Sequence, residues 1–273
     1  MKNLLKADFF RLFKSKLTII MLIIDIALPL LTTLLYAALV LILKKTSGEE
    51  GVEGFDILIN VKSMMTGCYS LTSNVGMLIP IFSAVFVSRD LTSGILRNKV
   101  ISGHKRINIF FSHILTSIVF NVVMITIYVI MTVLFGFIFF KYGTTFNHQE
   151  LINVVYFVIT GTMIFIFIST FTTLLALNFK SLPPIIIFTI VFSLALNIIT
   201  SILGFLDYEK YGVLMNLFPT FSMSRYTSVW GSLMGEGSVF TNQSFILGMI
   251  SLAFFSALNI LIGLSIFRRR ELK

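Results

Sequence analysis

Charged residues are scarce in this chain of 273 residues. Asp, Glu, Lys and Arg together make up 12% of it, about half the share found in ordinary soluble domains. Hydrophobic residues make up 56%, which leaves no room for a sizeable soluble domain. The single cysteine, Cys68, excludes an internal disulfide framework. We therefore expect residues 1–273 to form one membrane domain.

Several catalytic motifs are also missing. No Gly-Lys pair occurs, which excludes a Walker A phosphate loop, and there is no His-Glu-x-x-His. The histidines His104, His113 and His148 are far apart in the expected topology, and no cysteine accompanies them, which argues against a metal site. No paired acids lie within the apolar runs. We expect no catalytic, cofactor-binding or metal-binding residue, and the chain is not expected to be an enzyme.

Six apolar runs are long enough to cross a bilayer as helices, which takes about 17–25 residues. They cover residues 17–43, 71–87, 107–140, 151–177, 182–203 and 245–267. The expected fold class is therefore an all-α membrane protein with six transmembrane helices.

The segments outside these runs predict short helices. Residues 1–16 are basic and amphipathic, which suits an N-terminal interfacial helix, although a frayed tail is the alternative. Residues 55–65 could form a short surface helix. The semi-apolar pieces 214–219 and 226–234 are too short to cross, and they fit re-entrant or interfacial helices broken at Pro219 and Gly231.

The basic residues set the expected orientation. With six spans and both termini inside, the inner segments hold 15 of the 21 Lys and Arg residues and three acids. The outer segments then hold six basic residues and eight acids, an asymmetry that favours cytoplasmic termini. The net charge of +9 would also suit nucleic acid, but the bases lie between apolar runs, so we expect a lipid bilayer as partner instead.

The most charged interior segment, residues 89–99, lies between the second and third runs on the expected cytoplasmic side. It is typical of a short amphipathic helix, with Leu91, Ile95 and Leu96 on one face. Such a helix outside the bilayer could receive force from a soluble protein. The alternative is a loop that only orients the neighbouring spans.

Asp25 is the one acid inside an apolar run. An ionisable group there suggests ion coupling or contact with a cationic substrate. The alternative is a structural carboxyl that a neighbouring Ser or Thr satisfies. Other polar residues in the runs are expected mostly to form hydrogen bonds between helices: Thr32, Thr33, Asn121, Thr126, Asn197, Thr200 and Asn259.

This arrangement resembles, over the whole chain, the permease subunit of ABC-2 type (type V) ABC transporters. The local marker is acid-x-x-x-Gly-aliphatic-Leu after the second span, here Asp90 to Leu96, followed by Arg97. The family usually has Glu at the acid position, where this chain has the shorter Asp90.

The resemblance implies a permease dimer, with a second copy or a paralogue, in the bacterial cell membrane. Each half would bind a cytoplasmic ABC ATPase subunit, which carries the ATP and Mg, while this chain carries no cofactor. The cytoplasmic coupling helix would lie between spans 2 and 3. The implied ATPase-coupling residues are Arg89, Asp90, Leu91, Gly94, Ile95, Leu96, Arg97 and Lys99. A second ATPase contact would use Lys6, Arg11 and Lys14.

The cargo is less defined than the class. Similar permeases export antibiotics and amphipathic peptides, so we expect a hydrophobic or amphipathic cargo, most readily a peptide or antibiotic. Lipid-linked cargo or a drug would fit equally well. Two other functions stay open: a non-transporting membrane immunity or scaffold protein, and a gradient-driven transporter that uses Asp25 as part of its cargo pathway.

Overall fold

The computed structural model describes residues 2–47, 59–71, 75–143, 147–179, 181–230 and 242–269. Within these ranges all regular structure is helical and no strand occurs, which confirms the expected all-α class. The helices are α1 (Lys2–Phe13), α2 (Lys16–Ser47), α4 (Val61–Cys68), α5 (Val75–Thr92), α6 (Ile95–Ile101), α7 (Arg106–Phe139), α8 (His148–Asn178), α9 (Leu182–Leu203), α10 (Tyr208–Asn216), α11 (Phe221–Trp230) and α12 (Asn242–Arg269).

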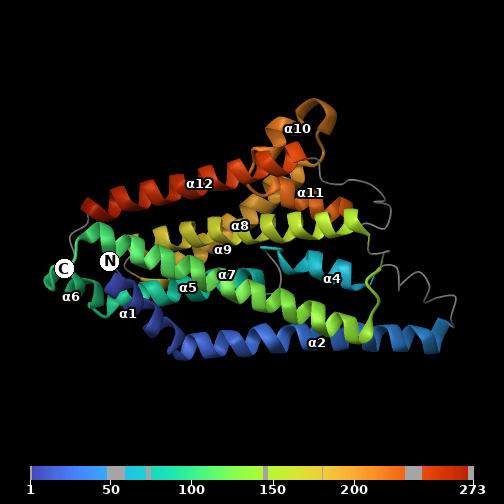
Figure 1. The fold of residues 1–273 in the computed structure, drawn as a ribbon, viewed down its shortest axis with the longest axis horizontal. Helices are drawn as coiled ribbons and strands as arrows, with labels where there is room; N and C mark the ends of the chain where they lie inside the picture. Colours follow the sequence, from blue (N-terminus) through green and yellow to red (C-terminus); the bar gives the residue numbers. More distant parts are fainter. Residues whose placement is uncertain are drawn as a thin grey trace.

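The long helices lie side by side in an elongated bundle (Figure 1). Among the described residues, five helices are long and apolar enough to cross a membrane: α2, α7, α8, α9 and α12. The α5–α6 pair, bent by 57°, would make a sixth span if it counts as one. The chain is thus a multi-pass membrane protein, and the count of six spans stays a prediction.

The helices begin and end close to the expected residues where proline or glycine marks a helix end. α9 covers residues 182–203 as expected, because Pro183 and Pro184 are tolerated only in its first turn and Gly204 follows its last residue. The run expected at 71–87 differs most. Its helix extends to Thr92, because nothing before Gly94 interrupts the backbone hydrogen bonds, so Arg89 and Asp90 lie on its last turns.

The central helices are α7 and α8, which pack against each other. α2 packs along α7, α12 packs along α8, and α5 contacts α7, α8 and α9. The most apolar stretch of α8 is 44% buried, against 17% for that of α2, so α2 lies at the periphery. The exposed apolar side chains of α2, such as Ile23 and Leu41, would face lipid.

The prediction of a surface helix at residues 55–65 is wrong both in the residues of the helix and in its exposure. Residues 55–58 lie outside the described residues, and the helix found there, α4, begins at Val61 and is largely buried against α7. Asn60 caps it by accepting a hydrogen bond from the Ser63 amide at 2.8 Å. The buried face of α4 includes the charged Lys62 as well as Val61 and Met65, so its burial depends on a partner for that charge elsewhere in the chain.

Tyr69, immediately after α4, packs between two aromatic rings of α8. Its ring centroid lies 5.3 Å from that of Phe157 and 6.2 Å from that of Phe165. This close approach requires Gly161, where a Cβ atom would overlap the Tyr69 ring. The glycine therefore lets the α4 segment pack against α8.

Gly161→Ala is expected to lower the free energy of unfolding by about 1–3 kcal/mol, because the added Cβ atom would overlap the buried Tyr69 ring and force it out of its contact with α8. Gly67→Ala on α4 is the matched control, since its Cβ would meet nothing within 4 Å. Thermal unfolding of both purified variants in one detergent provides the measurement. Equal midpoints for the two variants would contradict this account of the α4–α8 contact.

Some polar residues of the spans connect helices as expected. Asn121 donates to Ser83 at 3.4 Å, Asn259 donates to Thr170 at 3.3 Å, and Thr200 shares a 2.6 Å hydrogen bond with Thr220. Others bond to carbonyls of their own helix instead, because a hydroxyl four residues along a helix reaches that oxygen directly. Residues of this second kind are Thr32, Thr33 and Thr126. The Asn197 amide also donates to a carbonyl of its own helix, that of Ser193.

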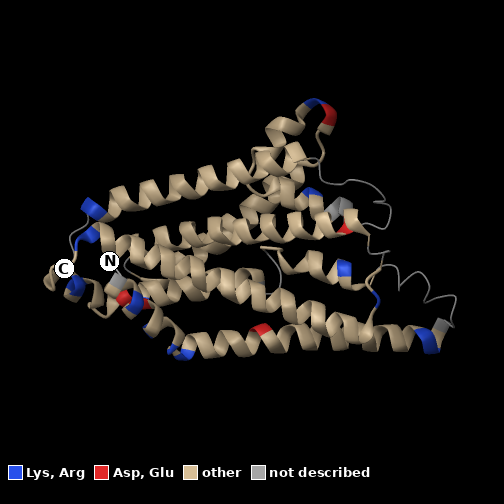
Figure 2. Ribbon diagram, viewed as in Figure 1, with Lys and Arg blue, Asp and Glu red and all other residues tan. Residues whose placement is uncertain are grey.

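Two short helices, α10 and α11, precede α12, and the break between them contains Pro219. Gly231 lies outside the described residues, and the re-entrant or interfacial role of these helices stays a prediction. α1, α6 and the C-terminal end of α12 lie at one end of the bundle, here called the terminal end (Figure 1). Arg106 at the start of α7 donates there to the Arg268 carbonyl at 3.0 Å. Figure 2 shows many of the basic residues gathered at this end.

Candidate functional site

The two charged segments singled out in the sequence meet at the terminal end. The segment 89–99 is not one helix. α5 ends at Thr92, Gly94 adopts a left-handed conformation with φ of 72°, and α6 then leaves at an angle of 57°. Glycine suits this turn because its φ is unfavourable for residues with a Cβ. The turn places α6 beside α7 and close to α1.

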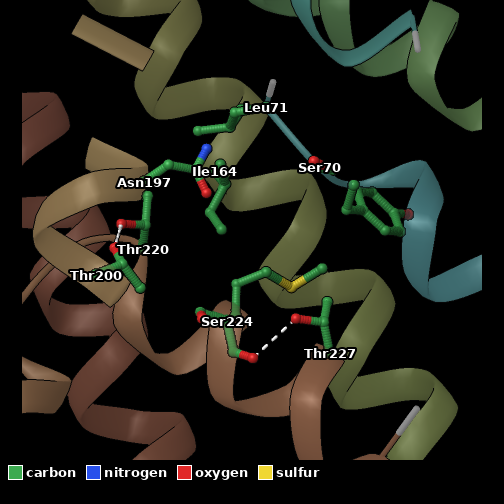
Figure 3. Close-up of a pocket in the computed structure, with 10 residues that line it drawn as sticks. Ser70, Leu71, Ile164, Asn197, Thr200, Thr220, Ser224 and Thr227 are labelled. Atoms are coloured by element: carbon green, nitrogen blue, oxygen red, sulfur yellow. Dashed lines mark hydrogen bonds between the residues drawn. The ribbon is translucent and has the colours of Figure 1, made fainter. Parts of the chain in front are cut away.

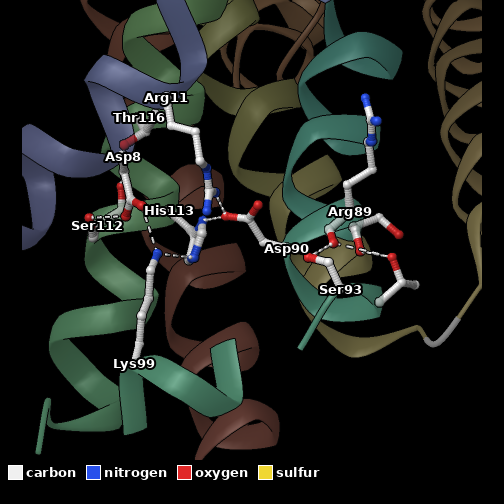
Figure 4. Close-up of polar contacts among 11 residues, drawn as sticks. Asp8, Arg11, Arg89, Asp90, Ser93, Lys99, Ser112, His113 and Thr116 are labelled. Atoms are coloured by element: carbon white, nitrogen blue, oxygen red, sulfur yellow. Dashed lines mark hydrogen bonds and ion pairs between the residues drawn. The ribbon is translucent and has the colours of Figure 1, made fainter. Parts of the chain in front are cut away.

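Six side chains form what we call the polar cluster: Asp8 and Arg11 of α1, Asp90 of α5, Lys99 of α6, and Ser112 and His113 of α7 (Figure 4). Four helices meet through this cluster. Two of its bonded members, Asp8 and Ser112, are 104 residues apart in the chain.

Ion pairs cross the polar cluster in two places. The Arg11 guanidinium pairs with the Asp90 carboxylate, which joins α1 to α5. The Lys99 Nζ atom lies 2.7 Å from Asp8 Oδ1, which joins α6 to α1. His113 lies between them, with Nε2 3.2 Å from Lys99 Nζ and Nδ1 3.7 Å from Asp90 Oδ2. α1 is therefore held to the bundle by charge as well as by apolar contact.

The acids of the cluster are shielded from water. Asp8 is 1% exposed and Asp90 is 3% exposed. Burial alone would raise the pKa of Asp8, but His113, Lys99 and Ser112, whose hydroxyl donates to it at 2.7 Å, favour the charged form. The pKa of Asp8 therefore lies below its ordinary value, and the carboxylate is ionised near neutral pH.

The structure divides the expected coupling residues into two groups. Asp90 and Leu96 are buried, and Lys99 points into the cluster. Arg89 and Arg97 are exposed, and Leu91, Gly94 and Ile95 are half-buried. In the second expected contact, Arg11 pairs with Asp90, whereas Lys6 and Lys14 are exposed. Of the eleven expected residues, four are thus buried or paired and hold the segment in place, four are exposed at its surface, and three are half-buried.

Three residues of this site were missed in the sequence. Ser112 and His113 look like ordinary residues near the start of an apolar run, and no local pattern links them to Asp8 or Asp90. Ile101, the last residue of α6, is 72% exposed beside the exposed Arg97 and Asn98. An apolar residue in a charged segment is a weak signal for a contact surface, and it could have been noticed.

A third ion pair lies near the opposite end of the bundle. Lys62 of α4 and Glu150 of α8 are 3.2 Å apart, and both are largely buried. Tyr142 donates to the same Glu150 oxygen at 3.1 Å. This pair links the short α4 to α8 and explains how the charged Lys62 can be buried.

A small cavity of about 100 Å³ lies where the end of α4 meets α8, α9 and α11 (Figure 3). Hydroxyl and amide groups line much of it, including Ser70, Asn197, Thr200, Thr220 and Ser224. None of the described residues that line it is charged. A space of this size holds about three water molecules and is too small for a peptide.

Asp25 of α2 is fully buried at 0% exposure. Neither of its carboxylate oxygens has a hydrogen-bond partner. The alternative, a structural carboxyl satisfied by a neighbouring Ser or Thr, is therefore not supported, because no described residue forms a hydrogen bond with it. Asp25 is thus a buried ionisable side chain whose carboxyl oxygens make no hydrogen bond within the described part of the bundle.

Within the described ranges, no three His, Cys, Asp or Glu side chains gather closely enough to hold a metal ion. Comparison with known proteins adds no assignment: no protein-family model matches the chain, and no curated protein matches it. The class that fold and composition define is a multi-pass, all-helical membrane protein.

Proposed function

We propose that this chain is the transmembrane subunit of an ABC exporter of the ABC-2 type. In this proposal a separate cytoplasmic ATPase hydrolyses ATP with Mg, and the permease works as a dimer in the bacterial cell membrane. The observation that carries the proposal is that one side of α6 is held by the bundle while the other side is exposed. Its inner side is fixed by Leu96 and Lys99, while Arg97, Asn98 and Ile101 are exposed.

This geometry supports a coupling role on physical grounds. A helix that is fixed to the bundle and exposed on its other side can pass a push to the spans. Leu96 is 1% exposed, and Lys99 links α6 to Asp8 of α1 and to His113 of α7. A displacement of α6 would therefore reach α1, α5 and α7 together. If the segment were only a loop that orients the neighbouring spans, α6 would not need to be held to the bundle in this way.

The charge distribution supports cytoplasmic termini. The terminal end carries the bases of α1, α6 and the starts of α2 and α7, together with Arg268 and Arg269 (Figure 2). Basic residues flanking spans favour the cytoplasmic side. A cytoplasmic ATPase would then meet α6 directly.

The cargo proposed for this exporter is a hydrophobic or amphipathic peptide or antibiotic. The support is the apolar character of the spans and the absence of charged residues from the cavity of Figure 3. That cavity is far smaller than such a cargo, so the conformation described here would be closed. ATP-driven movement would have to open a path between the helices.

The test is co-purification of the full-length chain from its native host in mild detergent. We expect a soluble ATPase to accompany the wild type and to be lost from a variant carrying Arg97→Glu and Ile101→Ser. The matched control carries Lys210→Glu and Leu214→Ser on α10, where both residues are also exposed. Reproducible absence of an ATPase from the folded wild type, or equal loss in both variants, would overturn the proposal.

A gradient-driven transporter is the second candidate, and Asp25 is the observation that favours it. A buried carboxyl without a partner inside a span is costly, and such residues often serve ion or substrate transfer. Gradient-driven transport would continue without any ATPase, which separates it from the first candidate.

A further inference from the structure

A groove of about 650 Å³ lies at the terminal end, between α1 with the start of α2 and the end of α5 with the start of α6. Its basic lining residues are Arg11, Lys14, Lys16 and Arg89, and its largest apolar ones are Phe10 and Phe86. The volume falls in the range of small-molecule sites, about 300–1,000 Å³.

The groove carries uncompensated positive charge. Its one acidic lining residue, Asp90, is already paired with Arg11. Lys14, Lys16 and Arg89 have no acidic partner among the described residues. Figure 4 shows Arg89 on the opposite side of α5 from Asp90, directed away from the polar cluster. Three cations are thus available to an anion in the groove.

Aromatic side chains stand beside these cations. Lys14 Nζ lies 4.5 Å from the centre of the Phe10 ring, and the Arg11 guanidinium lies 5.4 Å from that of Phe86. Phe10 is itself 62% exposed. Just beyond Lys16, α2 exposes Ile19, Ile20 and Ile23. Positive charge therefore adjoins an apolar surface at the start of a span.

This combination matches a molecule with an anionic head and apolar chains. We propose that the groove binds an anionic phospholipid, with its phosphate at Lys14, Lys16 and Arg89 and its acyl chains along the exposed start of α2. Basic pockets at the ends of spans bind such headgroups in membrane proteins by charge attraction. An acidic protein segment would satisfy the cations but would leave the adjoining isoleucines uncovered.

A bound lipid would lie between α1 and α5, beside the Arg11–Asp90 pair. It would add a contact between these two helices without touching the outer side of α6. The inference does not rest on the proposed exporter function, because lipid binding is measured on the purified chain without an ATPase.

The experiment uses the full-length chain in mixed micelles doped with phosphatidylglycerol or with phosphatidylcholine. Binding is read by native mass spectrometry and by the thermal unfolding midpoint. The test variant carries Lys16→Gln and Arg89→Gln. The matched control carries Lys44→Gln and Lys45→Gln, two exposed lysines at the other end of α2. A further arm adds inorganic phosphate alone.

We expect phosphatidylglycerol to bind to the wild type and control and to raise their midpoints, with about 20-fold weaker binding to the test variant. Phosphatidylcholine should change the binding signal and the unfolding midpoint equally in the wild type, the control and the test variant. Equal phosphatidylglycerol binding by the test variant, or an equal loss in the control, would overturn the proposal. Stabilisation by phosphate alone to the same degree would overturn the lipid assignment. If the test variant does not fold, the pair Lys14→Gln and Lys16→Gln replaces it.

Discussion

Asp90→Ala is expected to lower the free energy of unfolding by about 2–3 kcal/mol. Removing one member of a buried ion pair typically costs about 3–5 kcal/mol, because the other charge stays in a poorly solvated place. The smaller figure applies here since the Arg11 side chain is 35% exposed and can turn toward water. Arg11 and Lys99 would also be left with Asp8 as the remaining carboxylate of the polar cluster.

The matched control for this loss is Arg97→Ala on α6. Arg97 is exposed and has no ion pair with any described residue, so its loss should change stability by no more than about 0.5 kcal/mol. Unfolding in mixed micelles measures both variants. A double-mutant cycle with Arg11→Ala isolates the pair and should give a coupling energy of about 0.5–3 kcal/mol. A coupling energy near zero would show that the pair does not hold α1 to α5.

The same substitution also bears on the proposed function. With α1 loosened from α5, a push on α6 would no longer move these two helices as one unit. In membranes that contain the partner ATPase, Asp90→Ala should therefore lower transport-coupled ATP hydrolysis more than Arg97→Ala lowers it at equal ATPase occupancy. If Asp90→Ala left the coupling of ATP hydrolysis to transport unchanged while the ATPase stayed bound, the polar cluster would not transmit force from the ATPase to the spans.

Asp25→Leu is expected to raise the free energy of unfolding by about 2–3 kcal/mol, which is the cost of an acid at the centre of a span on insertion scales. Asp25 is fully buried on α2, and neither carboxylate oxygen has a partner. Leucine has the same branching at Cγ and needs no hydrogen bond. The gain should appear as a higher midpoint of unfolding in mixed micelles.

Thr33→Val is the control on the same face of α2, two turns further along. Thr33 is also buried, but its hydroxyl already donates to the Pro29 carbonyl at 2.6 Å. Its replacement should change stability by less than about 1 kcal/mol. A less stable Asp25→Leu protein would contradict the account and would mean that the carboxyl has a stabilising partner.

Transport by the Asp25→Leu protein then separates the two candidate functions. A more stable protein with normal ATP-driven export would show that the carboxyl is not used, as the exporter model allows. A more stable protein that has lost gradient-driven transport would favour the second candidate, because functional residues are often kept at a cost in stability.

Local signals in the sequence determined most of the fold class and the helix bounds. The apolar runs predicted four long helices to within three residues at each end, α7, α8, α9 and α12. Length and hydrophobicity suffice for this, because a span must satisfy its backbone hydrogen bonds within itself. Pro183 and Gly204 set the ends of α9 by backbone geometry alone. The scarcity of charge likewise indicated a membrane protein without any knowledge of contacts.

The tertiary structure alone decided which polar residues meet. Arg11 and Asp90 are 79 residues apart, and Lys99 and Asp8 are 91 apart, so no periodicity or spacing connects them. The segment 89–99 looked amphipathic, yet Asp90 and Lys99 turned inward because their partners on α1 and α7 compensate the cost of burial. Lys62 entered the bundle for the same reason, through Glu150. Asp25 shows the opposite outcome, since its helix packs against α7 and no described residue forms a hydrogen bond with its carboxyl. Hydrophobicity is a local property of the chain, so it can be read from the sequence. Charge compensation depends on which residues lie close together in three dimensions, so it cannot be predicted from the sequence alone.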